Sequence, residues 1–285
     1  MPFRLLPSDR DPTGLIRRLA AEQLDPLLTA GAELKVFEAR KRLKKLRAVL
    51  RLCRAGLRGA RAEGAALRDA AQGLSDTREA EVMLSVFRKL ASEAEAPGIE
   101  AYLLGRMGVA TVSETQALTF RTAIADVRQR SEGWVAKGRL AAVLAEGLMQ
   151  TRLRGKSAMQ VALTSAHDVD AVHDWRKQVK DLWYQARLFH PVWPAMMDPL
   201  VQAADDLGAA LGDHHDLAAF RDLLGQLDGT GALTREAAAL RSRARLSQAS
   251  IEATAGAEGA RLFAGKPRGM AKAWLDWRGI WRNAG

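Results

Sequence analysis

The sequence contains an internal repeat, and this repeat constrains the fold more than any other feature. Residues 36–46 match residues 172–182 at an offset of 136, and residues 74–79 match residues 211–216 at an offset of 137. The first match pairs three cations of one block with three of the other: Arg40 with Arg176, Lys41 with Lys177 and Lys44 with Lys180. Two blocks in the same order predict two equivalent halves, residues 12–100 and 110–282, within one domain spanning residues 1–285.

Both halves are predicted to be helical. The good helix formers Ala, Leu, Arg, Glu and Gln dominate, and apolar residues recur at spacings of three and four. We expect helices at residues 12–29, 33–58, 60–72, 76–95, 114–131, 135–156, 169–190, 195–210, 213–227, 232–260 and 269–282. With about four helices in each half, the expected fold class is all-α, two four-helix bundles related by pseudo-two-fold symmetry.

The charge balance of the chain indicates an anionic partner. The 285 residues include 43 Lys and Arg against 33 Asp and Glu, for a formal net charge of +10 and a pI near 10.2. Cys53 is the only cysteine, which excludes an internal disulfide and a cysteine-based metal site. No signal peptide or membrane-spanning run is apparent, so we expect a cytoplasmic protein with no membrane association.

Cations form a stripe along the helix expected at residues 33–58. On a helical projection, six of them lie within about 40° of one line: Arg40, Lys44, Arg47, Arg51, Arg54 and Arg58. The apolar residues Leu43, Leu46, Leu50, Cys53 and Leu57 lie on a second line beside it. No acidic residue falls between Arg40 and Arg54, so the like charges repel one another unless a polyanion neutralises them.

The second half repeats this construction. His173, Arg176, Lys180, Arg187 and His190 share one helix face, and Trp183 takes the position that Arg47 has in the first half. A single basic helix is usually a solvated surface helix. The doubled pattern instead favours an anion-binding groove, and because the cations lie beside the apolar line, we expect their replacement to leave the fold stable.

Two acidic blocks are predicted to begin helices. Asp76-x-x-Glu79 and Asp213-x-x-Asp216 each have an N-cap acid followed by a second acid in the first turn. This placement puts Arg78 and His215 in the first turn of a helix, where free backbone N–H groups also attract anions. Both side chains could therefore reach the groove.

These residues resemble the CHAD family, the conserved-histidine α-helical domain. The family motif is His-x-x-Arg-x-x-x-Lys-x-x-Arg-Tyr, once in each half. The second copy here is His173, Arg176, Lys180, Trp183 and Tyr184, and the first is Phe37, Arg40, Lys44, Arg47 and Ala48. The resemblance extends over residues 12–282. Phe37 and Trp183 depart from the motif, at the first histidine and the second arginine.

The resemblance implies two four-helix bundles around a central basic cavity that binds inorganic polyphosphate, with association with polyphosphate granules in some members. It implies a non-enzymatic role, without cofactor, metal or catalytic residues. The expected polyphosphate-binding residues are Arg40, Lys41, Lys44, Arg47, Arg51, Arg78, His173, Arg176, Lys177, Lys180, Arg187 and His215. A second tier that could extend the groove comprises Arg18, Arg54, Arg152, Arg154 and Tyr184.

Other functions remain open on the sequence alone. A nucleic-acid-binding protein, for RNA or single-stranded DNA, could use the same basic groove. An enzyme acting on polyphosphate would need clustered carboxylates to hold Mg²⁺, and no suitable spacing is present. His214 and His215 beside Asp213 and Asp216 suggest a metal site only weakly, because adjacent residues diverge on a helix. Trp274, Trp277, Trp281 and Cys53 are predicted to be core residues.

Overall fold

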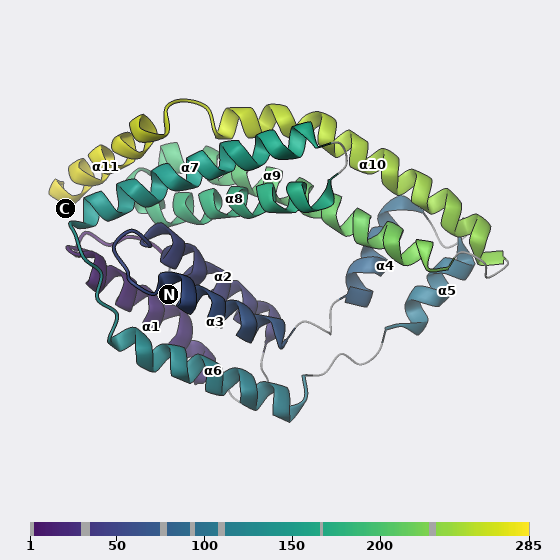
Figure 1. Cartoon of the computed structure of the whole chain (residues 1–285), viewed down its shortest axis with the longest axis horizontal. Helices are drawn as coiled ribbons and strands as arrows, with labels where there is room; N and C mark the ends of the chain where they lie inside the picture. The colour runs from purple at the N-terminus through teal and green to yellow at the C-terminus, as the bar shows by residue number, and fades with distance from the viewer. Residues whose placement is uncertain are drawn as a thin grey trace.

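The computed structural model describes residues 3–29, 35–74, 79–91, 95–107, 112–165, 168–227 and 232–284. The described residues are helical without a strand, as the sequence predicts; a single isolated bridge joins Leu57 and Ala136 (Figure 1). The helices are α1 (Pro12–Leu28), α2 (Val36–Leu52), α3 (Ala60–Gln72), α4 (Glu79–Leu90), α5 (Pro97–Gly105), α6 (Glu114–Glu132), α7 (Leu140–Thr164), α8 (Val169–Phe189), the 3₁₀ helix η1 (His190–Val192), α9 (Pro194–Gly225), α10 (Ala232–Leu262) and α11 (Pro267–Asn283).

Four helices differ clearly from those predicted. α7 begins at Leu140 and ends at Thr164, whereas residues 135–156 were expected. α2 ends at Leu52 rather than near residue 58, because the chain turns at Cys53–Gly59 and Gly59 adopts a positive φ of 84°. The two helices expected at residues 195–210 and 213–227 are one continuous helix, α9. Helix α5 was not predicted, because a Pro–Gly pair such as Pro97–Gly98 is typical of a turn between helices. Proline is also well placed in the first turn of a helix, where it lies here.

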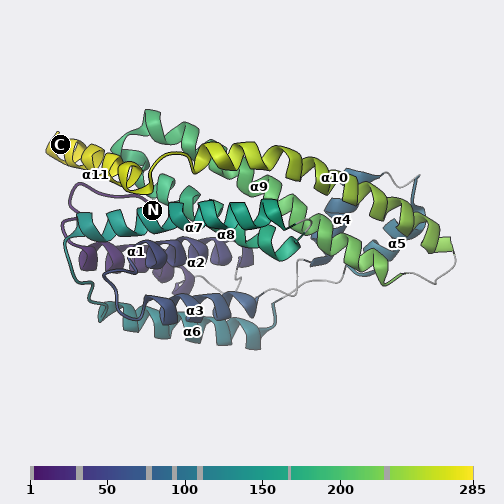
Figure 2. The ribbon, with the colours of Figure 1, turned by 45° about the horizontal axis from the view of Figure 1, so that its top comes forward.

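Most of the described helices pack in two groups (Figures 1 and 2). In the first group, α1 and α3 each contact both α2 and α6. In the second group, α7, α8, α9 and α10 pack in sequence, and α10 returns to contact α7. Helices α4 and α5 pack on α9 and α10, at the far end of the molecule from the first group, and α11 packs on α7.

This packing differs from the predicted division into residues 12–100 and 110–282. Helix α6 belongs to the second sequence half but packs with α1 and α3, through the buried residues Phe120, Ile124 and Val127. Helices α4 and α5 belong to the first half but pack on α9 and α10. A repeat identifies segments that are alike, whereas packing partners depend on which apolar faces the loops bring together. Short helices such as α4 and α5 have too little apolar surface to form a core alone.

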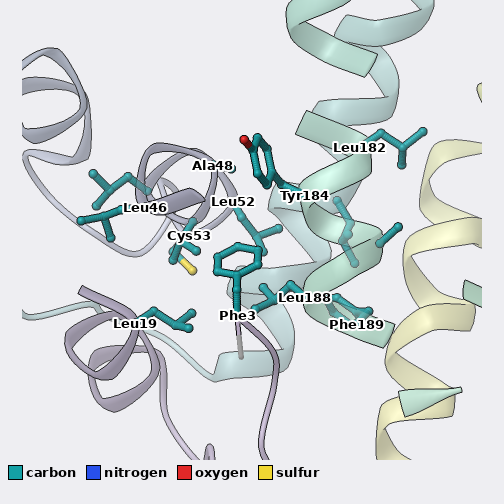
Figure 3. Packing of buried hydrophobic residues seen from close by; sticks show 14 of the residues in the cluster. Phe3, Leu19, Leu46, Ala48, Leu52, Cys53, Leu182, Tyr184, Leu188 and Phe189 are labelled. Carbon is teal, nitrogen blue, oxygen red and sulfur yellow. The ribbon is translucent and has the colours of Figure 1, made fainter. Parts of the chain in front are cut away.

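The two groups meet where α2 packs against α7 and α8. The approach is close because Gly147 of α7 lies over the end of α2: a Cβ atom there would be 1.9 Å from the Leu52 carbonyl oxygen. The N-terminal segment lies between α2 and α8, where the Leu5 amide donates to the Leu188 carbonyl at 2.9 Å. Figure 3 shows the Phe3 ring of this segment between Leu52 and Cys53 of α2 and Tyr184 and Leu188 of α8.

The predicted core residues are buried. Cys53 is fully buried, which raises the pKa of its thiol to about 12 and makes the thiolate inaccessible at neutral pH. Trp274 is buried, and Trp277 and Trp281 pack against the same core. Over the described ranges, no helix combines the length and apolar character required to cross a membrane.

Candidate functional site

Four cations of α2 share one side of this helix, beside the face that enters the core. Leu43, Leu46 and Leu50 are buried, whereas Lys44 is exposed and Arg40, Arg47 and Arg51 are partly exposed. Arg54 and Arg58 follow the end of the helix and do not continue its line, so the stripe is shorter than predicted. We call Arg40, Lys44, Arg47 and Arg51 the α2 stripe; it extends about 16 Å along the helix.

Arg51 is tied to the other helix group by a buried ion pair. Its Nε donates to Asp181 Oδ2 of α8 at 2.6 Å, and a second guanidinium nitrogen donates to Asp181 Oδ1, so the contact is bidentate. The Asp181 side chain is 8% exposed. Burial raises the pKa of Asp181, while Arg51, Arg47 and Arg154 act in the opposite direction. Arg51 is therefore a structural partner as well as a surface cation, contrary to the expectation for the whole stripe.

Arg47 lies beside this ion pair without sharing it. Burial lowers the pKa of Arg47, and the neighbouring charges of Arg51 and Arg68 lower it further, while Asp181 and Asp69 raise it. Its Nε is buried and has no hydrogen-bond partner among the described residues. Both observations describe a guanidinium whose positive charge the folded protein compensates poorly. An external anion would relieve this imbalance.

On α8, the corresponding cations lie against α9. Arg176 Nε donates to the Gly208 carbonyl at 3.1 Å, and a Cβ atom at Gly212 would be 2.9 Å from an Arg176 guanidinium nitrogen. Lys180 Nζ is 2.9 Å from Asp205 Oδ1, and a Cβ atom at Gly208 would be 2.7 Å from Lys180 Cδ. Asp205, Gly208 and Gly212 thus form one face of α9 that receives both cations. Sequence reasoning missed these three residues; the signal was two glycines four apart in an otherwise strong helix.

His173 of α8 and His215 of α9 bring the two predicted motifs together. Their ring centroids are 4.5 Å apart at an interplanar angle of 33°. Burial lowers the pKa of His173, followed by the charges of Lys177, His215 and Arg176, while Asp174 raises it. The Nδ1 atoms of both rings are buried without a hydrogen-bond partner in the described part of the chain. We call His173, Arg176, Lys180 and His215 the α8–α9 cluster.

The predicted helix start at Asp213 is wrong. Residues 213–216 lie in the middle of α9, so His215 reaches His173 from the side of a continuous helix rather than from a first turn. Gly212 breaks no helix; its lack of a side chain leaves room for the Arg176 guanidinium. Helix α4 begins at Glu79, and Asp76 and Arg78 lie outside the described residues.

Phe37 and Trp183, two of the departures from the family motif, have different surroundings. Phe37 is 58% exposed, and Lys41 Nζ lies 5.8 Å from its ring centroid. Trp183 is partly buried between two cations: Lys180 Nζ is 3.8 Å and the Arg187 guanidinium carbon 4.6 Å from its ring. Trp183 therefore holds Lys180 and Arg187 in place through cation–π contacts where an arginine would repel them.

The remaining predicted cations are positioned mainly by local contacts. Lys41 lies 3.6 Å from Glu38, and Lys177 lies 2.7 Å from Asp174, each within one helical turn. Arg18 of α1 binds Asp9 and Glu22 and donates to the Arg4 carbonyl. These pairs neutralise part of the positive surface.

The second-tier residues of the C-terminal half divide into a surface cation and two core residues. Arg154 of α7 is exposed and close enough to Arg54 to lower the pKa of that side chain, after burial and Arg61. Arg152 is buried, donates to the Leu262 carbonyl at 3.1 Å and has a pKa lowered to about 10 by burial. Tyr184 is also buried, which raises its pKa to about 12. The described residues contain no group of three or more His, Cys, Asp or Glu side chains that could hold a metal ion.

Comparisons with known proteins agree with the motifs. A family model, the CHAD domain, matches residues 15–225. Among solved structures, the chain is similar to the crystal structure of the CHAD domain from the plant Ricinus communis, with a TM-score of 0.58 and 18% sequence identity. This match covers 93% of this chain and 97% of that chain. No curated protein matches the chain.

Proposed function

We propose that this chain, which belongs to the CHAD domain family, binds inorganic polyphosphate without catalysis. The binding surface consists of the α2 stripe and the α8–α9 cluster. The family is associated with polyphosphate binding in general. Polyphosphate carries a negative charge on each phosphate unit and offers neither bases to stack nor edges to read. A binder for it needs rows of guanidinium and ammonium groups, and little else.

The observation that carries this proposal is the poor compensation of Arg47 and of the paired His173 and His215 rings in the free protein. Arg47 is partly buried beside Arg51 and Arg68, and its pKa is lowered as a result. The His173 ring lies 4.5 Å from the His215 ring and close to the charges of Lys177 and Arg176, and the Nδ1 atoms of both rings lack a partner among the described residues. A bound anion stabilises groups in such surroundings, because it relieves the repulsion between like charges and accepts new charge-assisted hydrogen bonds.

The two sites lie on helices that pack together. α2 contacts α8, and α8 contacts α9, so we expect a single extended polyanion to reach both sets of cations. In this proposal the two sets face a shared basic cavity between pseudo-symmetric bundles, and Arg187 and Arg154 extend it. Association with polyphosphate granules would follow from the same surface.

A binding panel at fixed salt tests the proposal. We expect long-chain polyphosphate to bind most tightly, followed by triphosphate, with single-stranded DNA, tRNA and sulfate weaker. Replacing Lys44 and Arg47 together by Ala should weaken polyphosphate binding at least tenfold, because each charge-assisted contact contributes about 1–3 kcal/mol. The paired cation Lys272, which lies 2.6 Å from Asp276 on α11, offers a matched control in Lys272→Ala.

The alternative function is nucleic-acid binding at the same cations. Competition separates the two: polyphosphate should displace bound tRNA, whereas tRNA should fail to displace polyphosphate. The opposite order of displacement would overturn the polyphosphate assignment. Incubation of polyphosphate with Mg²⁺ and the protein, followed by chain-length analysis, tests the non-enzymatic role; shortened chains would contradict it.

A further inference from the structure

A pocket lies between the N-terminal segment, the middle of α2, the end of α8 and the first part of α9, and it contains none of the four residues of the α8–α9 cluster. Its volume is about 570 Å³, within the range of small-molecule sites. Its polar lining residues are Arg4, Lys45, Arg187 and His190. Lys45 follows Lys44 in sequence and therefore projects about 100° away from it around α2. We call this the Lys45 pocket; of the predicted polyphosphate-binding residues, Arg187 alone lines it.

The Lys45 pocket is cationic without an acid among its lining residues. His190 Nε2 lies 2.7 Å from Asp198 outside the lining, and three further cations remain. Burial lowers the pKa of Lys45, and the charges of Arg187, Lys41 and Arg42 lower it further, with Glu38 opposing them. The folded protein thus holds Lys45 beside Arg187 at a cost that a bound anion would remove.

Comparison of the two repeats shows that this pocket lacks a carboxylate that the equivalent place in the other repeat contains. At the offset of 136, Lys45 corresponds to Asp181, and Arg51 corresponds to Arg187. Asp181 forms the bidentate ion pair with Arg51. At the equivalent place, Arg187 faces Lys45 instead of a carboxylate. One side of the α2–α8 contact therefore contains its own anion, whereas the other presents two cations to solvent.

We propose that the Lys45 pocket binds a small phosphate monoester with an apolar body. The phosphate lies beside Arg187, at the position equivalent to that of the Asp181 carboxylate beside Arg51. Its double charge matches Arg4, Lys45 and Arg187 better than a monocarboxylate does. The apolar body lies against Phe3, Pro191 and Val201, which complete the lining. Phe3 is fixed between α2 and α8 (Figure 3). Lys45 Nζ lies 5.9 Å from the Phe3 ring centroid.

The apolar wall separates this ligand class from inorganic polyphosphate. An inorganic chain has no group that gains from contact with Phe3, Pro191 or Val201. An aromatic or aliphatic ester buries part of its surface there, and burying about 60 Å² of apolar area corresponds to roughly tenfold in affinity. The inference concerns a different ligand class from the polyphosphate proposal, and each can fail without the other.

Calorimetric titration with phenyl phosphate and with inorganic phosphate tests the proposal. We expect one phenyl phosphate per chain, bound about tenfold more tightly than inorganic phosphate. Lys45→Asp should weaken phenyl phosphate binding at least tenfold. It should also raise the melting temperature, because the new carboxylate would lie beside Arg187 as Asp181 lies beside Arg51. Val201→Ser should reduce the preference for phenyl phosphate over inorganic phosphate.

Lys44→Asp is the matched comparison, since it makes the same charge change one residue away on α2. It should weaken long polyphosphate binding more than Lys45→Asp does, while phenyl phosphate binding changes less than threefold. Equal effects of Lys44→Asp and Lys45→Asp on phenyl phosphate would overturn the pocket, as would equal affinity for phenyl phosphate and inorganic phosphate. Vesicles containing phosphatidic acid distinguish a lipid monoester from a soluble one: retention by wild type and not by Lys45→Asp would assign the lipid as the source.

Discussion

Arg51 and Arg47 are one helical turn apart but differ in their contribution to the stability of the fold. Arg51 satisfies Asp181, a carboxylate buried in the α2–α8 contact. Arg51→Gln leaves that carboxylate without its charge partner, so we expect the free energy of unfolding to fall by about 3 kcal/mol. Arg47→Gln removes a charge that burial and two arginines disfavour, so the free energy of unfolding should stay unchanged or rise.

Thermal and denaturant unfolding of the two variants, without ligand, measures this difference. Leu46→Ala provides the scale, as truncation of a fully buried leucine costs about 2–5 kcal/mol. If Arg47→Gln destabilised the protein as much as Leu46→Ala, Arg47 would be a structural residue. If Arg51→Gln left stability unchanged, the Arg51–Asp181 pair would contribute nothing net to folding.

His173 should make polyphosphate binding depend on pH. Burial and neighbouring cations lower its pKa in the free protein, so the folded state favours the neutral ring and loses stability as pH falls below the ordinary value of 6.5. A bound polyanion favours the charged ring instead. Binding should therefore take up protons, and affinity should rise between pH 8 and pH 6.

Calorimetry in buffers of different ionisation enthalpy counts the protons taken up on binding. The control for titration of the phosphate chain itself is His173→Gln with the same polyphosphate. We expect this variant to take up fewer protons than wild type at pH 6.5. Equal uptake by the two proteins would place the titrating group elsewhere.

The glycines of α9 and α7 serve two different purposes, and alanine substitution distinguishes them. At Gly212, a Cβ atom would meet the mobile end of Arg176, which can move away. Gly212→Ala should therefore leave stability unchanged or raise it by up to about 1 kcal/mol through helix propensity. Because Arg176 is displaced from its place on α9, polyphosphate affinity should fall about fivefold, equivalent to roughly 1 kcal/mol.

At Gly147, an added Cβ atom would meet a backbone oxygen of α2, which cannot move without separating the two helix groups. Gly147→Ala should lower the free energy of unfolding by about 2 kcal/mol. Unfolding curves and polyphosphate titrations of both variants give the comparison. A loss of stability for Gly212→Ala comparable to that for Gly147→Ala would show that Gly212 serves backbone packing rather than the arginine.

Helix periodicity could be predicted from sequence, whereas helix continuity could not. The apolar lines of α2 and α8 are buried as expected, since a spacing of three and four residues fixes which face enters the core. The acidic block at Asp213 has the composition of a helix start, yet it lies within α9, because glycine and acidic residues are tolerated mid-helix where a basic side chain packs on them. The stripe was predicted; the partners on the facing helix, Asp181 and Asp205, were not, because long-range contacts leave no local pattern.

Over the whole molecule, the repeat identified the equivalent positions but not the exchange of elements between packing groups. Helix α6 packs with the first group and α4 and α5 with the second, although sequence order assigns them the other way. The same repeat became informative again once contacts were known. It shows that Lys45 stands where the second half has Asp181, a difference that has meaning only when Arg51 and Arg187 are located.

The two halves should contribute unequally to polyphosphate binding. Replacing Arg40, Lys44 and Arg47 by Ala removes three cations of the exposed face of α2. Among these three, Arg47 is the poorly compensated one, since its buried Nε has no hydrogen-bond partner among the described residues. The second variant replaces His173, Arg176 and Lys180, of which Lys180 binds Asp205 and Arg176 donates to the Gly208 carbonyl. A polyanion must compete with those contacts, so we expect the first triple variant to lose more affinity than the second.

Salt titrations of polyphosphate binding provide the measurement. By analogy with nucleic-acid phosphates, displacement of several counterions gives wild type a log–log slope on the order of −4 or steeper. The α2 triple variant should have a slope shallower by about 2–3, since each lost phosphate contact removes roughly one released ion. The α8 variant should change the slope less, because Asp205 and Gly208 already occupy two of its groups. A wild-type slope shallower than about −1 would contradict an extended contact, and a larger change for the α8 variant would reverse the ranking of the halves.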